Sequence, residues 1–146
     1  FTIMVSIQVE KLKQQIKDHE GYRLDVYVDT LGFDTGGYGH KMLPGEVPPT
    51  TKEGWDKIFD EDFDKAWKLT QKFCEENELS IPLDAECILC EMVYQMGFAG
   101  VSKFKMMIKA LKEKDFTEAA KQMLDSRWAK QTPSRANQLS KQMENV

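Results

Sequence analysis

The period of the hydrophobic pattern changes twice along this chain, and these changes restrict its fold more than any other feature. In the first segment the apolar side chains recur at helical spacing, as at Val9, Leu12 and Ile16, which predicts an N-terminal helix at residues 1–20. Residues 22–28 alternate apolar and polar side chains, which is typical of a half-buried strand. Helical spacing then returns and continues to the end. The sequence therefore predicts an α+β fold.

The strand-like segment opens a region rich in turn-forming residues. Glycines interrupt it at positions 32, 36, 37 and 39, and the pairs Pro44-Gly45 and Pro48-Pro49 close it. We expect a small antiparallel hairpin or meander over residues 22–43, within a β lobe at residues 21–50.

The rest of the chain is predicted to be helical. Residues 51–78 are expected to form one long connecting helix, opened by the capping-box pair Thr50 and Glu53. Its apolar stripe includes Trp55, and a larger all-helical lobe follows at residues 79–146. A length of 146 residues fits a single domain built from these four segments. A cleft between two such lobes is the default place for a ligand.

Composition and charge exclude several classes of protein. The net charge of −4 leaves too weak a basic surface for nucleic-acid binding. No apolar run approaches the ~20 residues that cross a bilayer, so no stable membrane insertion is expected. The opening Phe1–Ile7 is short and uncharged and lacks a small-residue cleavage site, so we expect no signal peptide.

The three cysteines are Cys74, Cys87 and Cys90, and their odd number favours free thiols made in a reducing compartment. Cys87 and Cys90 lie one helical turn apart, but a zinc site would need two further ligands, and His19 and His40 are the only histidines. We therefore expect no zinc site.

Two carboxylates in the β-region are candidates for acid–base chemistry. Glu20 precedes Gly21 at the predicted helix end, where the negative end of the helix dipole favours a protonated carboxyl. The competing interpretation is an exposed glutamate at a frayed helix end. Asp29 is equally explained as a turn-forming residue, and nine extended residues could hold the two up to ~30 Å apart. From the residues alone, they are candidates only.

Three motifs of the chain resemble those of a known family. The first is HEGYRLDVYVDTLGFDTGGYGH, in which Glu20, eight residues, Asp29, five residues and Thr35 lead to a GxGH-like end. The others are YQMGFAGVSKF at residues 94–104 and SRWAKQTPSRA at residues 126–136. In this order they resemble the phage-type lysozymes, glycoside hydrolase family 24, over nearly all of the chain from residue 17 to residue 136.

The resemblance implies a role for each matching residue. Glu20 would be the general acid that protonates the glycosidic oxygen, and Asp29 with Thr35 would position and activate the attacking water. This is the division of labour of an inverting glycosidase. The implied substrate-binding residues are Gly39, Gln95 and Arg135, the last of which would also orient the acid.

The resemblance also implies a structural pair between His40 and Asp62. The spacing supports it independently, because Ile58, Asp62 and Ala66 place a carboxylate on an otherwise apolar helix face, where it needs a partner. Trp128 is interpreted as core of the helical lobe.

The function implied by the resemblance is that of a muramidase. It would cleave the β-1,4 bond between N-acetylmuramic acid and N-acetylglucosamine in peptidoglycan glycan strands, with no metal and no cofactor. It would act as a monomeric endolysin that stays in the host cytoplasm until a holin releases it to the wall. A wall-penetrating domain carried on the virion is the alternative setting.

The chain departs from the family pattern in three ways. Gly36 stands where many relatives have a bulky apolar residue after the threonine, the stretch from His40 to Asp62 is much shorter than in the T-even phage enzymes, and the net charge is negative where many relatives are basic. Two other classes therefore stay open: a catalytically idle glycan-binding module, and a helical interaction protein unrelated to lysozymes.

Overall fold

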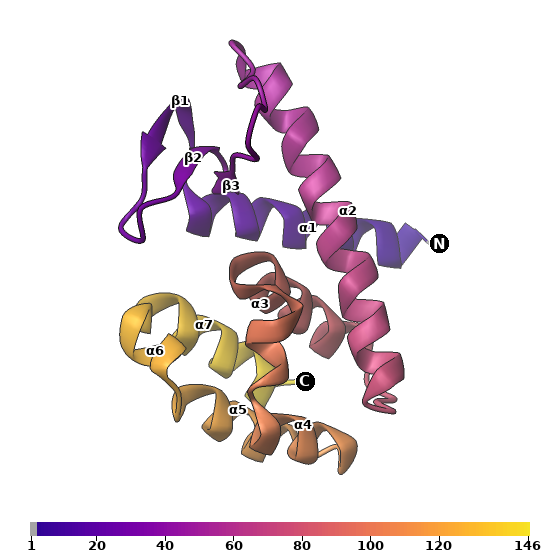
Figure 1. The fold of residues 1–146 in the computed structure, drawn as a ribbon. Helices are drawn as coiled ribbons and strands as arrows, with labels where there is room; N and C mark the ends of the chain where they lie inside the picture. The colour runs from indigo at the N-terminus through magenta and orange to yellow at the C-terminus, as the bar shows by residue number, and fades with distance from the viewer. Residues whose placement is uncertain (1–2) are drawn as a thin grey trace. The chain divides into compact units, whose positions relative to one another are not determined.

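The computed structural model describes residues 3–146, and this part of the chain contains seven helices and a three-stranded sheet (Figure 1). In chain order the elements are α1 (Ile3–Glu20), β1 (Arg23–Val28), β2 (Asp34–Gly37), β3 (His40–Lys41), α2 (Lys52–Glu76), α3 (Leu83–Ser102), α4 (Lys105–Lys112), α5 (Phe116–Leu124), α6 (Arg127–Gln131) and α7 (Pro133–Glu144). The predicted α+β class is confirmed. The helix expected over residues 1–20 begins at Ile3, and its first two positions lie outside the described residues.

The chain forms two compact units, and the second begins at Ala66, inside α2. The first unit holds α1, the sheet and the first part of α2. The second holds the end of α2 and the helices α3 to α7. None of the helices over residues 3–146 is both long enough and apolar enough to cross a membrane.

The sheet of the first unit is an antiparallel meander in the order β1-β2-β3, as predicted (Figure 1). β2 is the central strand, and Thr35 within it pairs with Tyr27 of β1 and Lys41 of β3. This central place explains why Thr35 is only 3% exposed. The sequence motif thus puts its threonine in the best-supported position of a small sheet.

The prediction that β1 is half-buried is wrong. Its apolar side chains Leu24, Val26 and Val28 are all exposed, and only Tyr27 is half-buried. The pairing register with β2 shifts after Arg23, so β1 is irregular where a simple alternation of faces was expected. In addition, three strands of two to six residues are too short to build a broad buried face.

The first unit is held together by the apolar stripe of α2. Trp55, Phe59 and Phe63 recur every four residues and are buried, as the helical pattern predicts. The ring of Tyr38, from the turn after β2, meets Phe59 edge-on at 5.5 Å, and the ammonium of Lys17 in α1 lies 4.9 Å from the Phe59 ring centre. These contacts join α1, the sheet and α2 into one small core.

The start of α2 differs from the predicted capping box by one residue. The backbone N–H of Gly54 donates to the hydroxyl of Thr51 at 3.1 Å, so Thr51 caps the helix and not Thr50. A Thr-Thr pair offers two equivalent caps, and local chain geometry selects between them.

The core of the second unit is built around α3. Its buried residues surround the helix from Ala85 to Val93, and the helix is kinked at Gly97, whose φ of 79° is not helical. Gly97 thus divides α3 into a longer part before it and a short part after it. Trp128 of α6 is buried, as predicted, with its ring 6.0 Å from Phe104.

Candidate active site

Asp29 directly follows β1 and lies in a tight turn that fixes one of its carboxylate oxygens. Oδ1 accepts hydrogen bonds from the backbone N–H groups of Phe33, at 2.8 Å, and of Leu31, at 2.9 Å. The Phe33 N–H is the largest cause that lowers the pKa of Asp29 below its ordinary value, and the Leu31 N–H, the charge of Lys41 and the Thr35 hydroxyl act in the same direction. Asp29 is therefore an ionised carboxylate at neutral pH, held by its own loop.

The second carboxylate oxygen of Asp29 faces the hydroxyl of Thr35. Oγ1 of Thr35 lies 3.4 Å from Oδ2 of Asp29 and 3.0 Å from the carbonyl oxygen of Phe33. A hydroxyl has one proton, which Oδ2 and the carbonyl oxygen share as alternative acceptors. When the carbonyl accepts it, Oδ2 stays available to accept a proton from another molecule. A carboxylate oxygen and a hydroxyl in this arrangement can hold and deprotonate a water.

Glu20 is the last residue of α1 and is half-buried, and its carboxyl lies against the backbone of Gly39. A Cβ added at Gly39 would lie 2.5 Å from Oε1 of Glu20. Gly39 also has a φ of +75°, which side-chain-bearing residues rarely adopt. The structure therefore brings together Glu20 with Gly39, and Asp29 with Thr35, all within the first unit.

His40 lies between two carboxylates. Its Nδ1 is 2.6 Å from Oδ2 of Asp62, and its Nε2 is 3.0 Å from both oxygens of Glu46. The hydrogen bond to Asp62 is the largest cause that raises the pKa of His40 to about 9, with a further contribution from Glu46. Both ring nitrogens thus donate at neutral pH. Glu46 was not predicted from the sequence, because it follows a Pro-Gly turn and nothing in its spacing connects it with a histidine.

Gln95 and Arg135 lie in the second unit, each with a defined partner there. The indole Nε1–H of Trp128 donates to Oε1 of Gln95 at 2.8 Å, and Nε of Arg135 donates to Oε2 of Glu91 at 2.8 Å. Glu91 is fully buried. Its position in the sequence carries a signal, because a carboxylate inside a helix that is apolar nearly all round requires a cationic partner. That Gln95 and Arg135 bind substrate stays a prediction.

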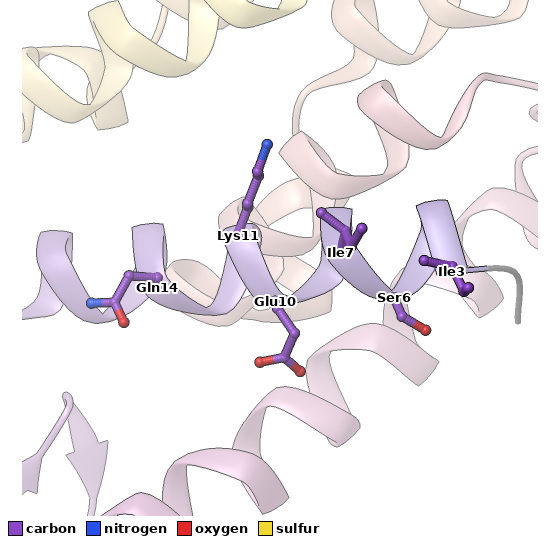
Figure 2. A pocket seen from close by; sticks show the side chains of 6 residues that line it. All are labelled: Ile3, Ser6, Ile7, Glu10, Lys11 and Gln14. Atoms are coloured by element: carbon purple, nitrogen blue, oxygen red, sulfur yellow. The ribbon is translucent and has the colours of Figure 1, made fainter.

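A separate hollow of about 550 Å³ lies over the first turns of α1. Figure 2 shows its lining side chains, all from that helix: Ile3, Ser6, Ile7, Glu10, Lys11 and Gln14. Glu10 and Lys11 point to different sides of the helix. None of the candidate catalytic residues lines this hollow.

The cysteines are free and buried, and burial raises the pKa of the Cys87 and Cys90 thiols to about 12. Over residues 3–146, no three side chains of His, Cys, Asp or Glu come together as a group that could hold a metal ion.

Most glycoside hydrolases use a pair of Asp or Glu side chains, and Glu20 and Asp29 are two carboxylates within the same unit. Residues 17–144 match the phage lysozyme family, and the chain belongs to that family. It is therefore a phage-type lysozyme and a glycoside hydrolase.

Named relatives agree with this assignment. "Probable T4-type lysozyme 2" and "Probable T4-type lysozyme 1" of Dictyostelium discoideum are 33% and 31% identical to the chain, in alignments that cover 90% of it and 92% of each relative. "Peptidoglycan hydrolase gp36" of Pseudomonas phage phiKMV is 29% identical over 96% of this chain, but only 16% of that longer protein is covered.

Proposed function

We propose that this lysozyme is a muramidase that cleaves the β-1,4 bond between N-acetylmuramic acid and N-acetylglucosamine in peptidoglycan, with inversion at the anomeric carbon. The observation that carries the proposal is the pairing of Asp29 with Thr35. One oxygen of the carboxylate is fixed by two backbone N–H groups, and the other faces a buried hydroxyl. This geometry supports activation of a water by Asp29 in preference to direct attack of its carboxylate on the sugar.

Each step of the reaction has a group to perform it. Glu20 donates its proton to the glycosidic oxygen as the bond from that oxygen to C1 of the muramic acid breaks. Water attacks C1 from the opposite face and loses a proton to Oδ2 of Asp29, while Thr35 holds the water in line. Proton exchange with solvent then restores both carboxyl groups. Because the water enters opposite the leaving group, the first product is the α-anomer.

The backbone at Gly39 supports the acid role of Glu20. No side chain separates this backbone from the carboxyl of Glu20, so a sugar ring can approach the acid closely over Gly39. We further propose that Gln95 and Arg135 contribute to substrate binding. In this proposal Trp128 orients the side-chain amide of Gln95, and Glu91 orients the guanidinium of Arg135.

Chemical analysis of the new chain ends tests the cleaved bond. Purified peptidoglycan is digested, reduced with borohydride and hydrolysed in acid. The proposal predicts muramitol, because the new reducing end is a muramic acid. Glucosaminitol would show cleavage of the other glycosidic bond, and the absence of both alditols would favour the catalytically idle glycan-binding module.

Substitution of Glu20 tests the acid. Glu20→Gln keeps the size and hydrogen bonding of the side chain but cannot deliver a proton, so turnover should fall by at least the ~100-fold that general acid catalysis contributes. The melting temperature should be unchanged or slightly higher. Activity within threefold of the parent would contradict the assignment.

For the biological role we propose an endolysin that is made in the host cytoplasm and released to the cell wall by a holin. The three free, buried cysteines fit synthesis in a reducing compartment. Deletion of the holin from a phage that encodes this chain should delay lysis without lowering the amount of lysozyme in the cell.

A further inference from the structure

The indole ring of Trp55 lies directly on the backbone of β2. Trp55 is 1% exposed. A Cβ added at Gly36 would lie 2.5 Å from Cη2 of the ring, and one added at Gly37 would collide with its Cε3 edge. Real Cβ atoms do not approach other atoms so closely, so the ring fills the space that side chains at these two positions would occupy. Two consecutive glycines thus form a seat for one tryptophan.

The polar edge of the same ring reaches the neighbouring strand. Nε1–H of Trp55 donates to the carbonyl oxygen of Leu24 at 2.8 Å. Leu24 falls in the stretch of β1, between Arg23 and Tyr27, where the pairing register with β2 shifts. Trp55 therefore contacts both strands at the place where their own pairing is irregular, and it ties them to α2.

Thr35 directly precedes the seat. Its hydroxyl lies 3.4 Å from Oδ2 of Asp29 and 3.0 Å from the carbonyl oxygen of Phe33. A movement of β2 changes both distances, and with them the place where a water is held. Misplacement of a reacting group by about 1 Å costs on the order of 100-fold in rate.

We propose that Trp55 is a positioning residue for the water-activating pair, and that it sets the place of Thr35 relative to Asp29 through its seat on Gly36 and Gly37. The inference rests on the proposed function. It also explains the unusual Gly36: the bulk next to the threonine is supplied from α2 and not from the strand itself. Trp55 touches neither the water nor the sugar in this role.

The first test is Trp55→Phe, which keeps a ring on Gly37 but removes the Cη2 end and the N–H. We expect kcat on soluble glycan fragments to fall at least tenfold while KM changes less than threefold. The matched control is Trp67→Phe, twelve residues further along α2 and in the second unit, which should keep kcat within twofold. All assays are run well below the melting temperature of each variant.

The second test enlarges the side chain at Gly36 and then makes the ring at Trp55 smaller to compensate. Gly36→Ala adds a methyl group where Cη2 lies and should lower kcat at least tenfold. In the double variant with Trp55→Phe the methyl group has room, so kcat should exceed that of Gly36→Ala by at least threefold. The inference would be overturned if kcat of the double variant, relative to the parent, were no higher than the product of the relative kcat values of the two single variants.

The third readout needs no turnover. The carboxyl carbon of Asp29 is titrated by NMR in the parent and in Trp55→Phe. The groups that favour the ionised form are the N–H groups of Phe33 and Leu31, the charge of Lys41 and the hydroxyl of Thr35. Movement of β2 weakens the contact of the Thr35 hydroxyl and, because Phe33 directly precedes β2, the hydrogen bond from the Phe33 N–H. The titration midpoint of Asp29 should therefore rise by at least 0.3 pH unit.

The outcomes separate this inference from the proposed function. If the parent releases no muramic acid ends but Trp55→Phe still raises the titration midpoint of Asp29, the muramidase is contradicted and the positioning of Thr35 relative to Asp29 by Trp55 stands. An active parent whose Trp55→Phe variant keeps its kcat and its Asp29 midpoint, whatever its melting temperature, shows that Trp55 only fills the core and overturns the inference.

Discussion

Asp62→Asn should destabilise the protein at neutral pH but have little effect above pH 9. In the parent, His40 donates to Asp62 from one ring nitrogen and to Glu46 from the other. The substitution keeps the shape of the side chain and removes its negative charge. His40 then retains only one anionic partner, and the free energy of unfolding falls.

The magnitude follows from the raised pKa of His40. The difference between 6.5 and about 9, at about 1.4 kcal/mol per pH unit, sets an upper bound of about 3–4 kcal/mol for the whole cluster. The side chains of Asp62 and Glu46 are 20% and 25% exposed, so solvent screens the charges. We therefore expect Asp62→Asn to lower the free energy of unfolding by about 1–2 kcal/mol at pH 6.

The direction of the pH dependence is fixed by the sign of the pKa change. The folded-state pKa of His40 is raised, so its stabilisation is fully present below about pH 6.5 and is lost as the pH rises through about 9. Urea unfolding at pH 6 and pH 10 measures both limits. The control is Asp64→Asn, the same change at an exposed position of α2. An equal loss at both pH values, or lost glycan cleavage with normal stability, would refute the structural role of the pair.

Three further predictions concern the site and the core. Gly39→Ala should lower turnover at least tenfold, because its methyl group displaces the Glu20 carboxyl, whereas Gly45→Ala, with a similar φ of +79° and open space around it, should retain turnover within twofold. Thr35→Glu should place a carboxylate where the water sits, so mass spectrometry should detect a covalent sugar adduct, or NMR a changed anomer; a water-cleaved α-product would contradict that placement. The thiol of Cys90, whose pKa is raised to about 12, should not react with a disulfide reagent at pH 8 before the protein unfolds.

The order and type of the main elements could be predicted from the sequence because they depend on local periodicity. The long α2 illustrates this, since an apolar residue at every fourth position needs no knowledge of its partners. The burial of β1 could not be predicted in the same way. Alternation at Leu24, Val26 and Val28 indicates a strand, but which face is covered depends on the register with β2 and on what packs there.

In the candidate site too, local features could be predicted from the sequence, but the packing between elements could not. Asp29 and Glu20 could be selected from charge and local position, and the resemblance to a family supplied the roles proposed for them and for Thr35. Two contacts could not be predicted from the sequence pattern: that of Glu46 with His40, and that of Trp55 with the seat formed by Gly36 and Gly37. The sequence shows only that position 36 lacks a side chain, whereas the structure shows that the ring of Trp55 fills the space of that side chain.

The anomeric configuration of the first product decides between a water and Asp29 as the group that attacks the sugar. In the proposed mechanism Glu20 donates the proton while Asp29 and Thr35 activate a water on the opposite face of the sugar. Proton NMR of the new reducing end, recorded before mutarotation, distinguishes the two possibilities. We predict the α-anomer from the unmodified protein. A β-anomer would show that Asp29 attacks the sugar itself, and it would contradict the proposed roles of Asp29 and Thr35.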